Sequence, residues 1–174
     1  MIHSILILLQ LAGFPSTDTR SVDFDNFTYR VDGQRITVKN GDWVKDDETG
    51  KAYLVVADIQ DGDLTGDGAS ESAILLESYG GGNGFYTSMQ VFSAATGRPK
   101  VIATLEGGDR DDGGIKRCGI QQGQLWVVRI FRDCAECSTS KCDRCFVTTF
   151  YRWDGKHLKA TKRVENLELP DAPN

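Results

Sequence analysis

Oxygen-bearing side chains crowd the stretch DGDLTGDGASE, residues 61–71, which carries six such side chains and three glycines. Calcium takes about six to eight oxygen ligands, so a calcium loop turns carboxylates inward at alternate positions while glycines absorb the bend. Counted from Asp63, oxygen-bearing side chains fall at positions 1, 3, 5 and 9, and position 7 offers its carbonyl; the set is Asp63, Thr65, Asp67, Ala69 and Glu71. No Lys or Arg lies within the stretch, so a calcium ion would relieve the repulsion among its carboxylates. The sequence therefore predicts a calcium-binding loop.

The full EF-hand pattern fails here, because its twelfth position, which should be a bidentate Glu, is Ile74. The shorter loop, followed directly by the apolar run SAILL, resembles the D-x-[DN]-x-D-G-x-x-[DE] loop of FG-GAP and VCBS-type repeats. The segment GDLTGDGASESAIL also resembles small uncharacterised bacterial exported proteins with a single such loop. This resemblance implies a structural calcium ion held between two strands. Thr65 departs from the pattern, because a hydroxyl is a poorer ligand than a carboxylate. The alternative is a simple turn, since Asp and Gly favour turns for conformational reasons alone.

Four of the five cysteines form a C-x2-C-x4-C-x2-C cluster: Cys134, Cys137, Cys142 and Cys145. Four thiolates can hold zinc in tetrahedral geometry, although typical zinc sites have a longer spacer between the pairs. The alternative is two disulfides across a hairpin. If the hairpin turns about residues 138–141, facing residues have numbers that sum to 279, so Cys134 faces Cys145, Cys137 faces Cys142 and Val128 faces Tyr151. We favour the disulfides and expect the fifth cysteine, Cys118, to be a buried unpaired thiol.

Short strands must position these loops. Segments rich in β-branched and aromatic residues alternate with Gly, Asp and Asn clusters, and no convincing long helix competes with them. We expect strands within residues 24–31, 34–44, 53–59, 71–78, 85–93, 100–106, 114–121, 124–132, 145–153 and 157–165. Their short connections predict an all-β, antiparallel meander that forms a sandwich or an open barrel. The length fits a single domain, residues 21–165, followed by a C-terminal tail at residues 166–174.

The N-terminus carries a mostly apolar run from Ile5 to Leu11. It is too short for a membrane span of about 20 residues but suits the core of a signal peptide, about 7 to 15 residues. We predict a signal peptide at residues 1–20, a periplasmic or extracellular location, and no integral membrane span; the alternative is a buried first strand. The net charge of −5 argues against nucleic acid as a partner, because binding to phosphate needs clustered Lys and Arg.

The chain shows no catalytic constellation, since His3 and His157 are its only histidines and neither lies in a recognisable nucleophile motif. We therefore expect an exported, non-catalytic binding or accessory module with a structural calcium loop and an unknown protein or glycan partner. The first alternative is a hydrolase that uses carboxylates of the calcium loop or of the second acidic loop, Asp109–Asp112. The second alternative is a cytosolic interaction protein with a zinc knuckle.

Overall fold

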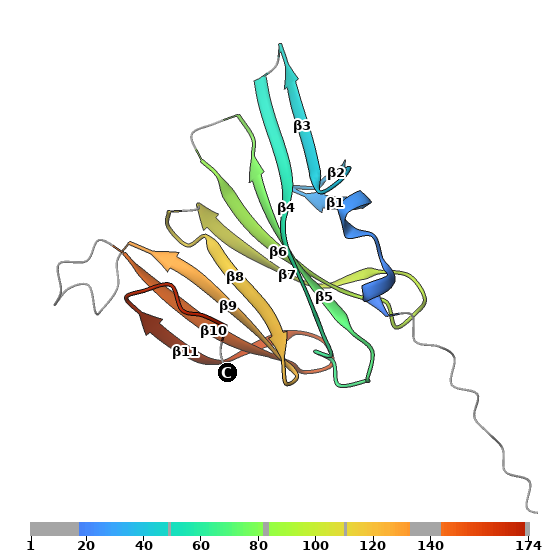
Figure 1. The fold of residues 1–174 in the computed structure, drawn as a ribbon, viewed down its shortest axis with the longest axis vertical. Coiled ribbons are helices and arrows are strands. Elements are labelled where there is room, and N and C mark those ends of the chain that lie inside the picture. Colours follow the sequence, from blue (N-terminus) through green and yellow to red (C-terminus); the bar gives the residue numbers. More distant parts are fainter. Residues whose placement is uncertain (1–17, 49, 82–83, 110, 133–143, 173–174) are drawn as a thin grey trace, which may run out of the picture.

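The computed structural model describes residues 18–48, 50–81, 84–109, 111–132 and 144–172. These residues form eleven strands in three antiparallel sheets and two short 3-10 helices, η1 (Thr19–Ser21) and η2 (Phe24–Asn26). The predicted all-β class is confirmed, and the arrangement is a single-domain sandwich rather than a closed barrel (Figure 1). Among the described residues, no helix has the length and apolar character needed to cross a membrane.

The largest sheet has five strands, and each strand pairs with the next along the chain. In order they are β3 (Asp42–Asp47), β4 (Gly50–Gly62), β5 (Glu71–Tyr79), β6 (Tyr86–Ser93) and β7 (Lys100–Asp109). The second sheet continues the meander with β8 (Ile115–Gln121), β9 (Gln124–Phe131), β10 (Cys145–Trp153) and β11 (Leu158–Asn166). A separate hairpin consists of β1 (Thr28–Val31) and β2 (Gln34–Thr37). The predicted meander is therefore confirmed, because every strand pair joins neighbours in sequence.

Strand β5 lies at the centre of the molecule and is buried on both faces. Ala73 and Leu75 face the four-stranded sheet, where they pack with Leu125 and Val127 of β9. The alternate residues point the other way, because side chains along a strand alternate between faces. There Ile74 and Leu76 pack against the β1–β2 hairpin and the 3-10 segment, in a cluster with Phe24, Tyr29, Val38, Leu54 and Phe92. The continuous apolar run of this strand follows from its position between two layers.

The register of the β9–β10 hairpin differs from the predicted one. Cys145 lies opposite Phe131 and Tyr151 opposite Leu125, so the numbers of facing residues sum to 276. The predicted register, with its odd sum, is therefore wrong for the described part of the hairpin, where Cys145 ends the ladder opposite Phe131. The reason is the alternation of faces: an odd sum would set core-facing Val127 opposite the exposed Arg152. The apolar pattern of the two strands fixes the pairing, whereas the prediction was centred on the cysteines.

Candidate functional site

The predicted calcium loop is the turn that joins β4 to β5. The two strands close its base, where Gly62 pairs with Glu71. Residues 63–70 form the turn, and Gly66 and Gly68 adopt φ angles of 79° and 85°. Residues with a Cβ rarely adopt this left-handed region, so the two glycines are what allow the chain to turn back within eight residues. The sequence correctly placed a tight turn between two strands here.

Glu71 holds this turn from its base. The residue is fully buried, at 0% exposure, and its Oε2 accepts hydrogen bonds from the backbone N–H groups of Leu64, at 3.0 Å, and Thr65, at 2.9 Å. The hydroxyl of Thr65 also donates to Oε1, at 3.4 Å. Within the described part of the chain, no Lys or Arg forms an ion pair with this carboxylate. Glu71 is therefore a buried negative group surrounded by the donors of its own loop.

The aspartates of the loop also bond to its backbone. Asp63 accepts from Gly66 N–H at 2.6 Å and from Gly68 N–H at 3.1 Å, and Asp67 accepts from Ala69 N–H at 2.8 Å. These bonds fix the path of the turn in the manner of Asx-turns. Among the described residues, no three His, Cys, Asp or Glu side chains lie close enough together to hold a metal ion. The predicted ligands thus share one turn, but their carboxylates do not converge on one point.

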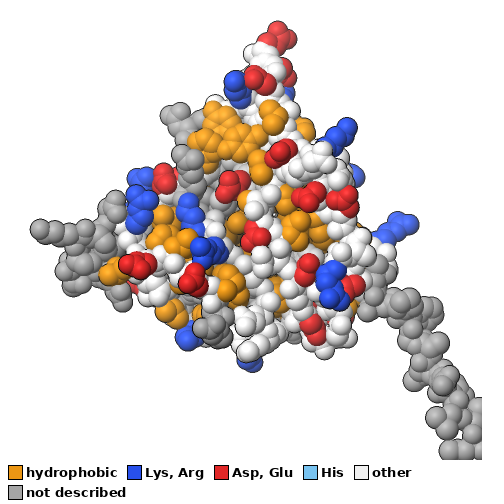
Figure 2. All heavy atoms as spheres, in the orientation of Figure 1, with side chains coloured by type: hydrophobic (Ala, Val, Ile, Leu, Met, Phe, Trp, Pro, Cys, Tyr) orange, Lys and Arg blue, Asp and Glu red, His pale blue; other side chains and the backbone are white. Residues whose placement is uncertain are grey.

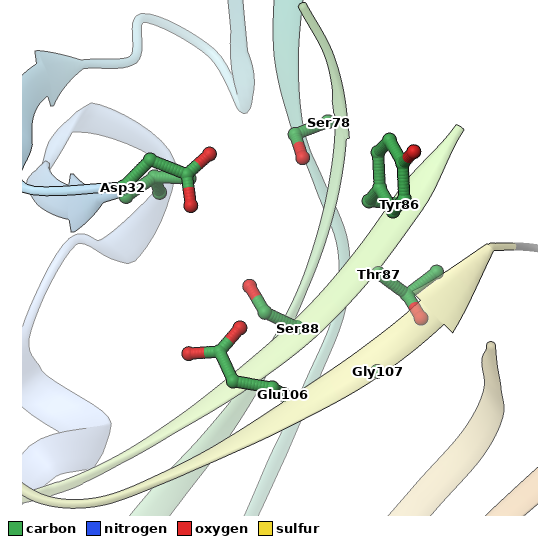
Figure 3. A pocket seen from close by; sticks show the side chains of 8 residues that line it. Asp32, Ser78, Tyr86, Thr87, Ser88, Glu106 and Gly107 are labelled. Carbon is green, nitrogen blue, oxygen red and sulfur yellow. The ribbon is translucent and has the colours of Figure 1, made fainter. Parts of the chain in front are cut away.

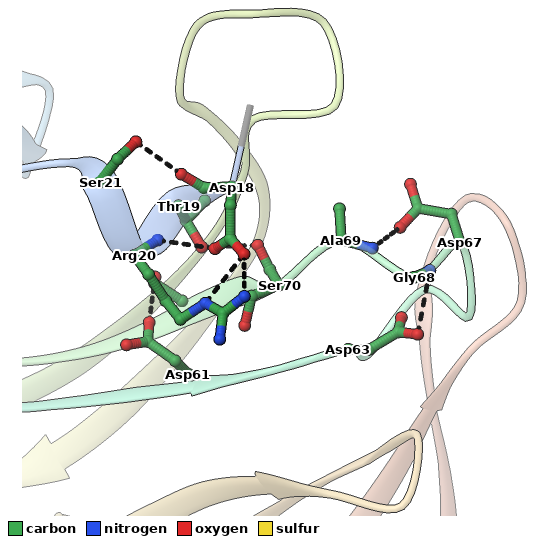
Figure 4. A network of polar contacts seen from close by, with 11 residues as sticks. Asp18, Thr19, Arg20, Ser21, Asp61, Asp63, Asp67, Gly68, Ala69 and Ser70 are labelled. Atoms are coloured by element: carbon green, nitrogen blue, oxygen red, sulfur yellow. Dashed lines mark hydrogen bonds and ion pairs between the residues drawn. The ribbon is translucent and has the colours of Figure 1, made fainter. Parts of the chain in front are cut away.

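A cationic neighbour of the loop comes from the start of the described chain. Figure 4 shows the side chain of Arg20 between Asp18 and Asp61 at the edge of the loop. Arg20 forms an ion pair with Asp18, and the hydrogen bond that the guanidinium donates to Asp18 raises the pKa of Arg20, with a smaller contribution from the charge of Asp61. Arg20, Asp61 and Asp63 line a pocket of about 280 Å³ beside the turn. The carboxylates of the stretch are therefore partly compensated, which the sequence did not indicate because 41 residues separate Arg20 from Asp61.

The segment before Arg20 is also part of the site. Thr19 is fully buried; its hydroxyl donates to the carbonyl oxygen of Ser70 at 2.6 Å, and its backbone N–H donates to the same oxygen at 3.3 Å. The predicted signal peptide, residues 1–20, includes this contact, while residues 1–17 lie outside the described residues. In the structure the folded unit therefore includes Asp18, Thr19 and Arg20, which the sequence had assigned to the leader.

The second acidic loop connects the two large sheets. Asp109 accepts hydrogen bonds from the N–H groups of Phe85, at 3.1 Å, and Asp111, at 3.0 Å, and Asp112 accepts from Arg132 N–H at 3.3 Å. The guanidinium of Arg129 donates to the carbonyl of Glu106, at 2.7 Å. The carboxylates of Asp109 and Asp112 thus bond to backbone groups and hold the crossover from β7 to β8 in place. That arrangement gives no support to their use as a hydrolytic pair.

The cysteines are only partly described, because Cys134, Cys137 and Cys142 lie outside the described residues. Cys145 is fully buried and disulfide-bonded. Cys118 is free, and its burial, together with the charge of Asp58, raises the pKa of the thiol to about 12. The burial of Cys118 agrees with its predicted role as a small apolar side chain. The pairing within the cluster stays a prediction.

An aromatic cluster lies on the part of the five-stranded sheet that extends beyond the second sheet. The rings of Tyr53, Tyr79 and Phe85 contact one another, with centroids 5.1 to 5.9 Å apart. Val44, the cross-strand neighbour of Tyr53, is 70% exposed. Figure 2 shows hydrophobic side chains gathered on this face, below the tip of the β3–β4 hairpin. Single-sequence reasoning missed this cluster, because its members come from β4, β5 and the segment before β6.

The fold and this site define an all-β sandwich with an acidic turn between two central strands. Comparison with known proteins finds no matching family model, no significantly similar curated protein and no significantly similar solved structure.

Proposed function

We propose that the protein is an exported, non-catalytic binding or accessory module in which the loop from Asp63 to Glu71 binds one calcium ion. The role of the ion is structural. It fixes the turn between β4 and β5, the two strands that connect both layers of the core, and so keeps the binding surfaces of the module in one arrangement. The partner is a protein or a glycan, and the half-buried aromatic cluster of Tyr53, Tyr79 and Phe85 supports a binding role.

The observation that carries this proposal is the environment of Glu71. Its carboxylate is fully buried and contacts neutral N–H and O–H donors of the loop. Burying a negative charge without a positive partner is costly, and a cation in the loop would supply that partner. Arg20 does not fill this role, because its ion pair is with Asp18 at the outer edge of the loop.

The other predicted ligands lie where they could join Glu71. Asp63 and Asp67 would supply carboxylate oxygens, Thr65 its hydroxyl and Ala69 its carbonyl. Each carboxylate oxygen has more than one acceptor site, so an oxygen that accepts an N–H bond can also ligate an ion. Calcium would draw these groups closer together than they lie in the structure. With only three carboxylates in reach, we expect an affinity in the millimolar range typical of extracellular modules, about 10⁻⁴–10⁻³ M.

The cysteines support the location in the same proposal. A disulfide at Cys145 fits an oxidising compartment such as the periplasm or the extracellular space, and a cysteine in a disulfide does not ligate zinc as a thiolate. We propose an N-terminal signal peptide as the route of export, with cleavage before Thr19 and thus before the end of the predicted range, residues 1–20. The contact of Thr19 with Ser70 supports this limit.

Thermal unfolding with calcium and with a chelator tests the proposal. For a dissociation constant near 1 mM, about 10 mM calcium stabilises the native state by roughly 1.4 kcal/mol, which raises Tm by about 3–6 °C in a domain of this size. Asp63→Asn and Asp67→Asn should abolish the shift, whereas Asp111→Asn, in the second acidic loop, should retain it. An unchanged Tm at 10 mM calcium, or an equal shift in all variants, would contradict the proposal.

A further inference from the structure

A second polar pocket lies on the opposite face of the five-stranded sheet from the second sheet. It has a volume of about 240 Å³ and sits between the β1–β2 turn and strands β5, β6 and β7. Its polar lining consists of two carboxylates and four hydroxyl groups: Asp32, Glu106, Ser78, Tyr86, Thr87 and Ser88. In Figure 3 the side chains of Asp32 and Glu106 extend into the pocket from its two sides, and the hydroxyl of Ser88 lies beside the carboxylate of Glu106.

The floor of the pocket is a bulge in the edge strand β7. Ser88 pairs with Glu106 and Tyr86 with Asp109, so β7 carries one more residue than β6 over this interval. A Cβ atom on Gly107 would clash with the backbone carbonyl oxygen and the side-chain Oγ1 of Thr87, so only glycine allows the two strands to approach this closely. Thr87 Oγ1 in turn accepts from Ile115 N–H at 2.7 Å. The floor is therefore built from close backbone contacts.

The wall with Asp32 is a tight turn that is also held in place. Asp32 and Gly33 both have positive φ angles, 49° and 76°, as a two-residue turn of type I′ requires. Behind the turn, the side-chain amide of Gln90 donates to the carbonyl of Arg30 at 2.8 Å. Gln90 lies two residues from Ser88 on the same face of β6, is 4% exposed, and its Oε1 has no hydrogen-bond partner in the described structure. The turn therefore fixes Asp32 over the sheet.

The charge of the pocket is uncompensated. No Lys or Arg is among its lining residues, and neither Asp32 nor Glu106 forms a side-chain hydrogen bond or an ion pair with another described residue. Two carboxylates that line one pocket repel, and a cation between them removes the repulsion. The ring of Tyr86, 55% exposed at the pocket, offers a surface for the apolar stem of such a ligand.

We propose that this pocket binds an organic ammonium group, carried by a lysine side chain or a free amine, between Asp32 and Glu106. Two carboxylates and neutral hydroxyls suit one positive charge. A metal cluster would need a third Asp, Glu, His or Cys side chain, and the described residues of the pocket do not include one. The ammonium group donates to the two carboxylates and to the oxygen of Ser88, and its carbon stem lies against Tyr86. This site is independent of the proposed calcium loop.

The test is a titration followed by amide NMR in buffer that contains a chelator. The probes are N-acetyl-lysine methylamide, n-butylammonium, and the neutral control N-acetyl-norleucine methylamide. We expect both amines to give saturable shifts at residues around Asp32, Ser88 and Glu106, and the neutral control to give none. Tighter binding of the lysine derivative indicates a peptide as the source, and equal binding indicates a free amine.

Variants of the two carboxylates make the test specific. Asp32→Asn preserves the turn, because Asn tolerates the positive φ. Asp32→Asn and Glu106→Gln should each weaken amine binding about threefold, and the double variant about tenfold, as expected for solvent-exposed charge pairs. Asp111→Asn should bind like the wild type. Equal binding of the neutral control, unchanged binding by the double variant, or the absence of saturable shifts would overturn the proposal. Because chelator is present throughout, a failure of the calcium proposal leaves this result unaffected.

Discussion

Removal of the Glu71 carboxylate is the strongest perturbation of the acidic loop that the structure allows. In Glu71→Ala, the N–H groups of Leu64, which is buried, and of Thr65, which is partly buried, lose their shared acceptor. Each buried donor left without a partner costs about 1–3 kcal/mol, so the variant should lose about 3–4 kcal/mol in free energy of unfolding. That is a large part of the roughly 5–15 kcal/mol that stabilises a typical domain. Glu71→Gln keeps one carbonyl oxygen as acceptor and should lose only about 1 kcal/mol.

Urea unfolding followed by tryptophan fluorescence in the presence of chelator measures these losses without any contribution from calcium. Glu77→Ala is the matched control, because Glu77 lies on the same strand but is exposed, and its change should stay within about 0.5 kcal/mol. If Glu71→Ala cost less than about 1 kcal/mol, or no more than Glu77→Ala, the buried carboxylate would not be what holds the turn, and the reasoning would be refuted.

Two further predictions concern titrating groups. Because burial raises the pKa of Cys118 to about 12, thiol reagents at pH 8 should not modify this cysteine in the folded protein but should modify it in denaturant. In denaturant, one reactive thiol per chain supports two disulfides, whereas five reactive thiols would support the zinc alternative. The variant Cys118→Ala should lower the count by one in either case. Hydrogen bonds from Lys159 and from the backbone of His157 and Lys156 lower the pKa of Asp154, so its contribution to stability is present above about pH 4, the unfolded value, and is lost as pH falls below it. The Tm difference between the wild type and Asp154→Asn should therefore shrink steadily between about pH 4 and pH 2, and a constant difference over that range would contradict this.

The fold class followed from local sequence patterns. Alternating apolar segments and Gly- or Asp-rich connections predicted an antiparallel meander, and every strand pair joins sequence neighbours as expected. The same local patterns did not predict which strands belong to which of the two large sheets. The second acidic loop was expected only as one of the short connections of the meander, whereas it is the crossover between the two sheets, with Gly108 N–H donating to Gly113 O at 2.9 Å. Turn composition does not distinguish these cases, because both need glycine where backbones approach closely.

The turn between β4 and β5 was predictable in position but not in its contacts. The spacing of Asp63, Asp67 and Glu71 correctly indicated one compact turn, because local glycines determine such turns. The burial of Glu71 is set by the layers around β5, and Thr19 and Arg20 reach the turn from a distant part of the chain. Contacts of this kind depend on tertiary packing, so a local pattern of residue types does not reveal them.

The most direct test of the account is an amide NMR titration of the protein with calcium. The account predicts saturable shifts at the amides of residues 64–69 and 71, with half-saturation near about 1 mM. In Asp63→Asn these shifts should be lost, while the dispersion of the remaining resonances stays unchanged. Shifts that are absent at 10 mM calcium, or that spread over the acidic surface without saturation, would contradict the claim that this turn is a calcium site.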